Sequence, residues 1–449
     1  MARLFGTDGV RGVANRDLTP ELTFYLGRAA GALLRRRAER PRLLIGRDTR
    51  ASGDMLEAAL IAGATSAGVD CAVAGVIPTP GVAYVTKRES FDAGVMISAS
   101  HNPVEDNGIK FFSSDGFKLT DDEEAEIEAE VRRLQAGEDS LPRPTAGAVG
   151  TRRETAGGAQ AYAAFLKEAF DLDLSGKKIV VDCANGAASA FAPGILESLG
   201  AEVIALYVEP TGVNINVGCG STHPERAQSA VVEHGAWAGL AFDGDADRVI
   251  AVDERGELVN GDHILAILGL DMLRRGALPR RALAATVYSN LGLKLALEKE
   301  GGTVVETAAG DRYVLEAMLK EGLILGGEQS GHVILLEHNT TGDGILTGLA
   351  LLATAIRCGA NLSELKQAMT PLPQVLVNVR VADKSRLKEC RAVADAVRAG
   401  EERLKGRGRI LVRASGTEPV VRVMGEGESM DEVQSIVGEI AAVIGRELG

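Results

Sequence analysis

Three aspartates stand at alternate positions in the segment AFDGDADRVIAVDE, where Asp243, Asp245 and Asp247 follow an apolar run. A turning loop with this spacing can gather carboxylates around one hard cation, and ligand sets made only of oxygen suit Mg²⁺, Ca²⁺ or Mn²⁺. Without a cation, the three carboxylates would repel one another. An EF-hand is disfavoured, because Arg248 stands where that loop needs glycine and because both flanks read as strands. The segment therefore predicts a metal site.

A second segment, GVMISASHNPVEDNGIKFF, places two hydroxyl groups and an imidazole at the end of another apolar run. Asn-Pro and Asp-Asn-Gly are turn signals, so Ser98, Ser100 and His101 are expected on a constrained loop. Taken alone, the stretch favours an ordinary turn whose polar side chains satisfy its own backbone. A chemical role for it depends on which other loops lie beside it.

Two more segments set polar groups between small residues. GGEQSGH offers Glu328, Ser330 and His332, and a carboxylate with a hydroxyl suits vicinal sugar hydroxyls, although a glycine-rich hairpin would look similar. VRASGTEPVVRV can bind phosphate through backbone amides, hydroxyls and guanidinium groups, and an exposed turn with surface arginines is an equally good interpretation. The candidates in this phosphate turn are Arg413, Ser415, Gly416, Thr417 and Arg422.

Two cations could serve a site that handles a phosphate dianion. Arg11 lies among glycines in FGTDGVRG, and Lys110 follows the Asn-Gly turn of the serine segment. The glycine fingerprint of a dinucleotide-binding fold is absent, which disfavours a nicotinamide enzyme. Hydroxyl groups, an acidic loop, a sugar-compatible loop and a phosphate turn together predict phosphoryl transfer on a phosphorylated polyol.

The elements that must position these loops recur three times along the chain. Short apolar strands alternate with amphipathic helices from Arg42, again from Lys178 and again from Ala282. This pattern is typical of largely parallel sheets covered by helices. The loops SASHNP (the serine loop), DGDADR (the acidic loop) and GEQSGH (the sugar loop) each follow the last strand of a repeat. Ligands bind at the carboxyl ends of such strands, so three equivalent domains could direct the three loops into one cleft.

Composition shifts divide the chain into four expected domains. The boundaries are 1–152 for the domain of the serine loop, 153–255 for the acidic loop, 256–370 for the sugar loop and 371–449 for the phosphate turn. The last of these reads as a small α+β domain with a mainly antiparallel sheet. The acidic run TDDEEAEIEAEV is interpreted as a helix start, with carboxylates at the favourable end of the helix dipole, rather than as a second metal site.

The composition sets limits on partners and compartment. Of the 449 residues 45% are hydrophobic and 25% charged, an ordinary globular balance, and the net charge of −13 argues against nucleic acid or an anionic membrane as partner. The five cysteines include no CxxC pair and favour a reducing compartment. With neither a leader-like N-terminus nor an apolar run of membrane-spanning length, the chain is expected in the cytoplasm.

In this order and across essentially the whole chain, the four segments resemble those of the α-D-phosphohexomutase family. ISASHNP is similar to that family's phosphoserine loop, DGDADR to its magnesium loop, GEQSGH to its sugar-binding loop and RASGTEP to its phosphate-binding loop. FGTDGVRG, NINVGCGSTHPE, GDRYV and Gln329 are typical of family members that act on glucosamine phosphates. Ala309, where valine is expected before GDRYV, is a small departure.

The resemblance implies a fold and an activity. The fold would be α/β, with three related mixed α/β domains around a central cleft and a smaller, hinged C-terminal α+β domain, in a homodimer. The activity would interconvert glucosamine 6-phosphate and glucosamine 1-phosphate through an enzyme phosphoserine and a glucosamine 1,6-bisphosphate intermediate, and would feed UDP-N-acetylglucosamine and peptidoglycan synthesis. A phosphomannomutase or phosphoglucomutase is the nearest alternative, because it shares all four loops. A non-catalytic, metal-dependent sugar-phosphate sensor is another.

The resemblance also distributes roles among the residues. Ser100 would carry the phosphoryl group, beside one Mg²⁺ per active site held by Ser100 and the three aspartates of the acidic loop. The sugar would be bound by Arg248, Glu328 and Ser330. The phosphate that does not react would be bound by Arg413, Ser415, Gly416, Thr417 and Arg422. The candidates for acid or base catalysis are Lys110, His332, Arg11 and His101, and the sequence leaves their order open.

Overall fold

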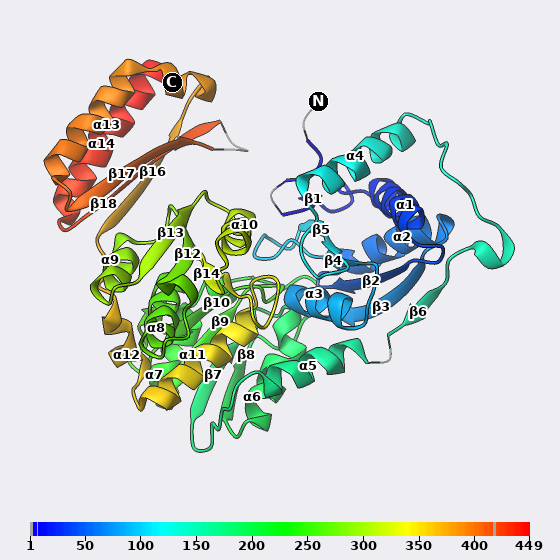
Figure 1. Ribbon diagram of the computed structural model, residues 1–449, viewed down its shortest axis with the longest axis horizontal. Helices are drawn as coiled ribbons and strands as arrows, with labels where there is room; N and C mark the ends of the chain where they lie inside the picture. Colours follow the sequence, from blue (N-terminus) through cyan, green and yellow to red (C-terminus); the bar gives the residue numbers. More distant parts are fainter. Residues whose placement is uncertain (1–2, 7, 156, 416–418) are drawn as a thin grey trace. The chain divides into compact units, whose positions relative to one another are not determined.

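Four sheets form the framework of the chain in the residues that this computed structural model describes, 3–6, 8–155, 157–415 and 419–449 (Figure 1). In spatial order, the first sheet holds β1 (Val10–Val13), β5 (Asp106–Ser113), β4 (Ala93–Ile97), β2 (Arg42–Arg47), β3 (Asp70–Val76) and β6 (Arg152–Glu154). The second holds β11 (Leu258–Val259), β10 (Val249–Val252), β9 (Ala238–Phe242), β7 (Lys178–Asp182) and β8 (Glu202–Leu206). The third holds β13 (Thr303–Thr307), β12 (Ala282–Thr286), β14 (Leu325–Gly327) and β15 (Val333–Leu335). The fourth holds β16 (Gln374–Arg380), β18 (Val420–Gly427) and β17 (Gly408–Ala414).

The first three sheets repeat one arrangement of strands. A central strand (β2, β7 or β12) has parallel neighbours on both sides, and one of those neighbours pairs with an antiparallel return strand. The serine, acidic and sugar loops connect that neighbour to its return strand, at β4–β5, β9–β10 and β14–β15 respectively. The prediction of three related α/β domains is confirmed. The return strands make each sheet mixed, as the family resemblance implied, whereas the pattern of the residues had suggested largely parallel sheets.

Helices follow the strands in all four parts of the chain. Around the first sheet they are α1 (Pro20–Arg37), α2 (Ser52–Ser66), α3 (Thr79–Arg88) and α4 (Asp121–Gln135). The middle of the chain adds α5 (Gly158–Glu168), α6 (Ala192–Ser198), α7 (Glu225–His234), α8 (Gly261–Arg274), α9 (Leu291–Lys299), α10 (Asp311–Glu321), α11 (Gly344–Cys358) and α12 (Leu362–Leu365). The fourth sheet carries α13 (Arg391–Leu404) and α14 (Met430–Leu448).

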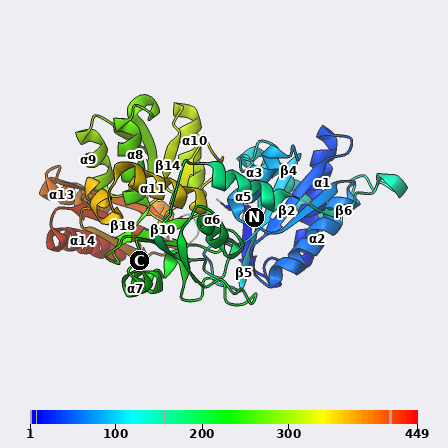
Figure 2. The ribbon, with the colours of Figure 1, turned by 90° about the horizontal axis from the view of Figure 1, so that it is seen from below.

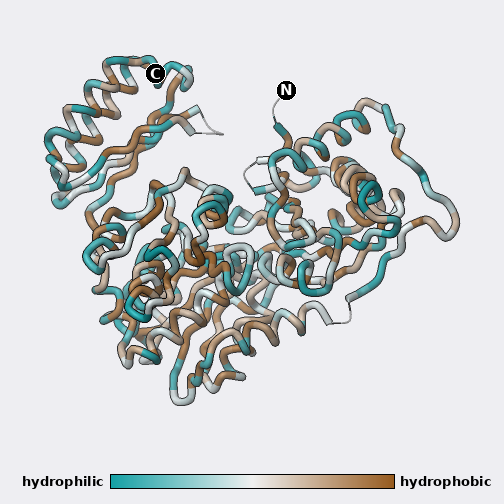
Figure 3. Tube along the Cα trace, in the orientation of Figure 1, coloured by the Kyte–Doolittle hydropathy of each residue, from teal (hydrophilic) through white to brown (hydrophobic). Residues whose placement is uncertain are grey.

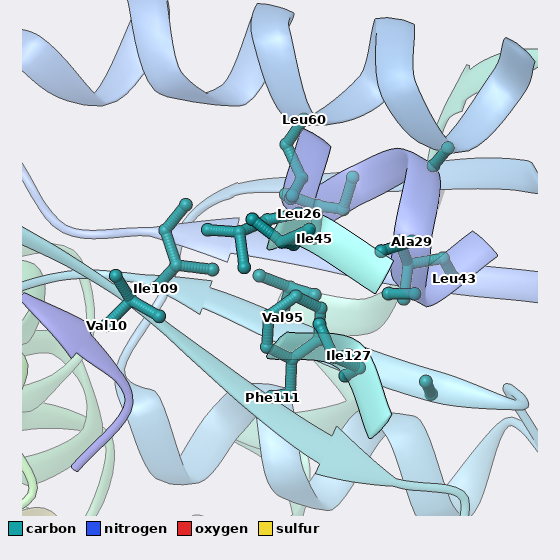
Figure 4. Packing of buried hydrophobic residues seen from close by; sticks show 14 of the residues in the cluster. Val10, Leu26, Ala29, Leu43, Ile45, Leu60, Val95, Ile109, Phe111 and Ile127 are labelled. Carbon is teal, nitrogen blue, oxygen red and sulfur yellow. The ribbon is translucent and has the colours of Figure 1, made fainter. Parts of the chain in front are cut away.

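The first sheet has its hydrophobic core on the face covered by α1 and α2. These two helices lie side by side in both ribbon views (Figures 1 and 2), and the strands beneath them are mostly hydrophobic (Figure 3). Leu26 of α1 and Leu60 of α2 pack against Ile45 and Val95 of the sheet, and all four side chains are completely buried (Figure 4). Burying a side chain of this size contributes about 1.5–3 kcal/mol.

The opposite face of this sheet is approached closely by α3. A Cβ atom at Gly94 would lie 2.2 Å from Thr86 Oγ1, and one at Gly46 would lie 2.6 Å from Val82 Cγ2. The two glycines therefore let α3 lie against the strands without steric overlap. This packing fixes the start of α3, Thr79, near the edge of the sheet where the serine loop begins.

The acidic run starts α4, as predicted. Thr120 accepts a hydrogen bond from the backbone N–H of Glu123, whose carboxylate accepts one from the backbone N–H of Thr120, and this reciprocal pair forms a capping box. The first turn holds four carboxylates, where the helix dipole favours negative charge.

The described chain forms two compact units, residues 1–288 with 302–368 and residues 289–301 with 369–449. The second unit contains the fourth sheet and also α9. Buried Glu426 of β18 accepts a hydrogen bond from the backbone N–H of Leu291, 2.9 Å away, and Asn290 exchanges two hydrogen bonds with the backbone of Leu372. The start of α9 is therefore tied to the C-terminal sheet, although the sequence places this helix between two strands of the third sheet.

No single helix among the described residues is long and apolar enough to cross a membrane. One pair, α11 with residues 362–368, passes such a test by length and composition only, and its two parts are bent by 90°. Nearly all of α11 is buried within the protein, as expected for a core helix.

The start of α11 is held at a junction of three parts of the first unit. Asp343, fully buried, caps the helix by accepting a hydrogen bond from the backbone N–H of Leu346. Its carboxylate also accepts hydrogen bonds from the hydroxyl of Tyr162 on α5, at 2.9 and 3.0 Å, and from the amide of Asn339. Asn339 in turn donates to the backbone carbonyl of Pro80 on α3. Burial raises the pKa of Asp343 to about 6.

This raised pKa predicts a pH dependence of stability. A buried carboxyl group with a raised pKa stabilises the folded state fully below its unfolded pKa, and this contribution is lost as the pH rises through its folded pKa. Between about pH 4 and pH 8, the wild type should therefore lose about 3 kcal/mol relative to Asp343→Asn, which stays neutral. Thermal unfolding of both proteins across this range measures the difference. Parallel pH profiles would contradict the assignment.

Candidate active site

The acidic loop gathers its three aspartates at the end of β9. Asp243, Asp245 and Asp247 are all buried, and one carboxylate oxygen from each lies within 4.8 Å of the other two. Asp245 Oδ1 and Asp247 Oδ1 are buried without a hydrogen-bond partner in the described chain. Buried acceptors of this kind, on a set of ligands that offers only oxygen, fit a hard divalent cation. No other group of His, Cys, Asp and Glu side chains in the described residues has this arrangement.

Two aspartates of this triad, Asp243 and Asp247, have pKa values shifted in opposite directions. Burial, together with repulsion from Asp247 and Asp245, raises the pKa of Asp243 well above its ordinary value. Burial would also raise the pKa of Asp247, but Lys110 and His332 outweigh it and lower that pKa below its ordinary value. Without a bound cation, the pKa values of these two crowded carboxyl groups therefore move in opposite directions, because neighbouring positive side chains outweigh burial only at Asp247.

The serine loop meets the triad across the boundary between two sheets. Ser100 Oγ donates a hydrogen bond to Asp243 Oδ2 over 2.5 Å and lies 3.3 Å from His101 Nδ1. Ser98 Oγ donates to Asp48 Oδ2 over 2.6 Å and accepts the backbone N–H of Ser100. Of the two serines, Ser100 presents its hydroxyl to the triad, whereas the hydroxyl of Ser98 holds the loop.

Two side chains share Asp245 Oδ2. Lys110 Nζ lies 2.8 Å from it, and Thr79 Oγ1 at the start of α3 donates a hydrogen bond over 2.5 Å. Lys110 Nζ also lies 3.1 Å from Asp8 and 3.7 Å from Asp247. Burial would lower the pKa of Lys110, but these carboxylates outweigh it and raise the pKa above its ordinary value. Lys110 is therefore a cation at neutral pH.

A ring of ion pairs and close contacts joins the triad to the sugar loop. Lys118 forms ion pairs with Asp8 and, over 2.5 Å, with Asp311. Asp311 lies 3.6 Å from His332 Nε2, and His332 Nδ1 lies 3.6 Å from Asp247. No role was predicted for Asp8, Lys118 or Asp311 from the sequence. A signal was present for two of them, because Asp8 belongs to FGTDGVRG and Asp311 to GDRYV.

The pKa values of the two histidines are shifted in opposite directions. Burial, with Arg248 nearby, lowers the pKa of His101 to about 4, so this side chain is neutral at pH 7 and can accept a proton. Burial would also lower the pKa of His332, but Asp247 outweighs it and raises the pKa above its ordinary value. The backbone N–H of Gly342 donates to His332 Nε2 over 3.1 Å, and a Cβ at Gly342 would lie 2.4 Å from that atom. Glycine is therefore required beside the imidazole.

The other predicted residues of this unit surround the same loops. Arg248 Nε lies 3.6 Å from the triad, and Arg11 contacts the serine loop at Asn102 Oδ1 over 3.4 Å. Glu328 of the sugar loop is half-buried, and burial raises its pKa above the ordinary value. Ser330 at the tip of that loop is exposed, so its hydroxyl is accessible to a ligand.

The phosphate turn belongs to the second compact unit. Arg413 of β17 and Arg422 of β18 stand directly opposite each other in the antiparallel pair, which directs both side chains to the same face of the sheet. Ser415 is buried where the turn begins. Gly416 and Thr417, the other two residues predicted here, lie outside the described residues.

The first unit thus brings the serine hydroxyl, the acidic triad, the candidate acids and bases and the sugar loop into one connected set of contacts. The hydroxyl of Ser100 is hydrogen-bonded to a triad that fits a divalent cation, and a protonated lysine (Lys110) and a neutral histidine (His101) lie beside it. This arrangement is suited to moving a phosphoryl group. The phosphate turn offers two guanidinium groups on one face of its sheet, and groups of this kind are suited to binding a phosphate.

Comparison with known proteins agrees with this chemistry. Four models of the phosphoglucomutase/phosphomannomutase family match the chain in order. They are the alpha/beta/alpha domains I, II and III, at residues 2–138, 160–256 and 260–372, and the C-terminal domain, at residues 376–443.

Relatives match the chain over its whole length. Phosphoglucosamine mutase of Heliobacterium modesticaldum is 55% identical and covers 99% of this chain and 100% of its own, and that of Carboxydothermus hydrogenoformans is 55% identical with 99% of both chains covered. A phosphoglucomutase/phosphomannomutase family protein from Burkholderia thailandensis has the same fold, with a TM-score of 0.82 over 99% of this chain and 97% of its own at 24% identity. The chain therefore belongs to the phosphoglucomutase/phosphomannomutase family of α-D-phosphohexomutases, isomerases that move a phosphoryl group on a sugar.

Proposed function

We propose that this chain interconverts glucosamine 6-phosphate and glucosamine 1-phosphate through a phosphoserine at Ser100 and a glucosamine 1,6-bisphosphate intermediate. The observation that carries the mechanism is the position of Ser100 Oγ, 2.5 Å from Asp243 Oδ2 in a buried acidic triad. The choice of glucosamine is supported by 55% identity, over the full length of both chains, to phosphoglucosamine mutases. The product would feed UDP-N-acetylglucosamine synthesis.

Mg²⁺ is the cation that we assign to the triad. Asp243, Asp245 and Asp247 would hold it together with an oxygen of the phosphorylated Ser100, and two of these aspartates each have a buried oxygen without a hydrogen-bond partner, which fits that role. When bound, it would neutralise charge that develops on the phosphoryl group. A hard, oxygen-only ligand set with a phosphate ligand is characteristic of Mg²⁺ sites.

The protein groups then divide the remaining work. As a sugar hydroxyl oxygen bonds to phosphorus, the bond from phosphorus to Ser100 Oγ breaks, and the hydroxyl proton needs an acceptor. His101 is neutral at pH 7 and lies 3.3 Å from Ser100 Oγ, so it is the candidate acceptor of that proton, whereas Lys110 keeps its proton and balances negative charge. A second transfer, from the other position of the bisphosphate, returns a phosphoryl group to Ser100. Glu328 and Ser330 would orient the sugar, and the phosphate turn would hold the phosphate that does not react.

Two broader predictions complete the proposal. A cytoplasmic location is supported by the five cysteines, which are all free thiols. A homodimer is expected from the family resemblance, and the oligomeric state in solution tests it.

A substrate panel tests the proposed function. We expect kcat/KM for glucosamine 1-phosphate to exceed that for glucose 1-phosphate and mannose 1-phosphate by roughly 100-fold, because a site built to pair a polar substituent discriminates strongly against analogues that lack it. Turnover of all three should require added Mg²⁺ after treatment with a chelator. A marked preference for the mannose substrate would instead assign the chain to the phosphomannomutases, and turnover unaffected by metal removal would contradict the role of the triad.

A further inference from the structure

We propose that Arg50 and Asn216 are positioning residues that hold the serine loop in the conformation from which Ser100 transfers its phosphoryl group. The inference rests on the proposed role of Ser100. It gives a function to the segment NINVGCGSTHPE, in which Asn216 lies, and to a buried arginine that the catalytic assignments leave out.

The serine loop needs such support because its backbone is strained. Ser100 has a φ of +55°, in the left-handed region that residues other than glycine, asparagine and aspartate adopt rarely. A strained residue keeps its conformation only where surrounding contacts determine it. The conformation matters here because it directs Ser100 Oγ to Asp243.

Arg50 supplies the largest part of these contacts. Its side chain is completely buried, and its guanidinium group donates to three backbone carbonyl oxygens of the serine loop. The distances are 2.9 Å to Ser100, 2.9 Å to Asn102 and 2.5 Å to Pro103. Nε of the same group lies 3.0 Å from Asp48 Oδ2, which also accepts the hydroxyl of Ser98. One planar group therefore ties together both ends of the loop.

Asn216 binds the loop from the other side. Its amide Nδ2 donates to the carbonyl oxygen of Ser100 over 2.9 Å and to that of Asn102 over 3.2 Å, the two carbonyls that Arg50 also contacts. A Cβ at Gly244 of the acidic loop would lie 2.6 Å from the same Ser100 oxygen and 3.0 Å from Asn216 Nδ2. The carbonyl of Ser100 is thus enclosed by two donors and the acidic loop, which places the serine loop in register with the triad.

The segment that carries Arg50 is itself hydrogen-bonded to two loops that follow strands β7 and β8 of the second sheet. Thr49 Oγ1 donates to the backbone carbonyl of Asn185 over 2.6 Å, and the backbone N–H of Ala51 donates to the backbone carbonyl of Gly212 over 2.9 Å. The contacts of Arg50 and Asn216 with the serine loop therefore lie at the boundary between the first and second sheets, where Ser100 also contacts the triad. The geometry of these contacts should persist when the hydroxyl gains a phosphate, because every loop atom that they hold is a backbone carbonyl oxygen.

Two isosteric or near-isosteric variants test the proposal. Arg50→Lys keeps the charge but cannot reach three carbonyls with one planar fork. Asn216→Asp keeps the shape, and aspartate tolerates the φ of +59° at this position, but the donor is lost. We expect kcat to fall roughly 100-fold for Arg50→Lys and roughly tenfold for Asn216→Asp, with KM within about twofold, because misplacement of a reacting group by about 1 Å slows the chemical step on this scale.

The chain offers a matched control for each variant. Arg28 is also completely buried, pairs with Asp139 and donates to the carbonyls of Leu141 and Ser66, but it touches no part of the serine loop. Asn214 lies two residues before Asn216 and bonds within its own loop. Arg28→Lys should lower the thermal midpoint and Asn214→Asp should change little, and both should keep kcat within about twofold of the wild type.

Intact mass and kinetics together separate the possible results. The rate at which phosphate leaves Ser100 in a single turnover should fall in both test variants and in neither control. Three results would overturn the positioning role and leave the proposed function intact. They are a wild-type kcat in Arg50→Lys, an equal loss of kcat in Arg28→Lys, and a change in the test variants that is confined to KM. A wild type that turns over without a phosphoserine would overturn both.

Discussion

Ser100→Ala should reduce turnover of glucosamine phosphates on the order of 10⁴-fold or more, and the phosphorylated form of the protein should disappear with it. The reason is that Ser100 has the hydroxyl hydrogen-bonded to Asp243 over 2.5 Å, whereas the neighbouring Ser98 hydroxyl is occupied by Asp48 and the loop backbone. A phosphoryl group that arrives on the sugar must leave a covalent carrier, and alanine cannot serve as one. Intact mass before and after incubation with the bisphosphate measures the carrier, and a coupled assay measures turnover.

A matched serine variant controls for general damage to the first sheet. Ser113 ends β5 and donates its hydroxyl to the backbone carbonyl of Phe117, away from the triad. Ser113→Ala should keep both the phosphorylated form and turnover. If Ser100→Ala turned over normally, or if its phosphate were found on another residue, the proposed mechanism would have to be abandoned.

Asp243→Asn should have opposite effects on stability and on activity. In the metal-free protein, burial and the two neighbouring aspartates raise the pKa of Asp243, so its ionised form destabilises the folded state increasingly as the pH rises. Replacing this carboxyl group with a neutral amide should stabilise the metal-free protein at pH 7.5 by about 0.5–2 kcal/mol, the usual gain from a stabilising substitution. The rise in thermal midpoint on adding Mg²⁺ should shrink or vanish, and turnover should fall by roughly 10²–10³-fold, as on loss of one strong electrostatic contact to a transition state.

A second buried aspartate, Asp182, serves as a control for the general effect of replacing a buried aspartate with asparagine. Asp182 ends β7, its pKa is raised by burial to about 6, and its two oxygens accept the backbone N–H groups of Ala184 and Gly220. Because an asparagine has only one acceptor oxygen, Asp182→Asn should lower the thermal midpoint and keep the response to Mg²⁺. A lower midpoint for metal-free Asp243→Asn would show that the triad is not a set of crowded carboxylates awaiting a cation.

Much of the site could be predicted because its motifs are local. The alternate spacing of three aspartates is enough to place their carboxylates in one turn, at Asp243, Asp245 and Asp247. The apolar strands on both sides of this turn argue against an EF-hand. Repetition of strands and helices shows that three loops occupy equivalent places, since the carboxyl ends of parallel strands share an edge. The same patterns do not reveal the antiparallel return strands, such as β5, because a buried strand has the same hydrophobic pattern in either direction.

Only the tertiary structure decides which residues complete the site, because those contacts join positions far apart in the chain. Ser100 and Asp243 are 143 residues apart, and Lys110 and Asp245 are 135 apart, so no local spacing encodes either pair. The structure also separates the candidate acids and bases, since their protonation depends on which charges and how much burial surround each one.

The same reason explains the residues that sequence reasoning missed. Asp8, Lys118 and Asp311 act through ion pairs between distant segments, and Arg50 and Asn216 act on backbone carbonyls, which carry no mark in a sequence. The sequence by itself therefore determined the loops, the types of side chain that they carry and the family. The tertiary structure decided how those loops are held and charged, because burial and long-range pairing exist only once the chain has folded.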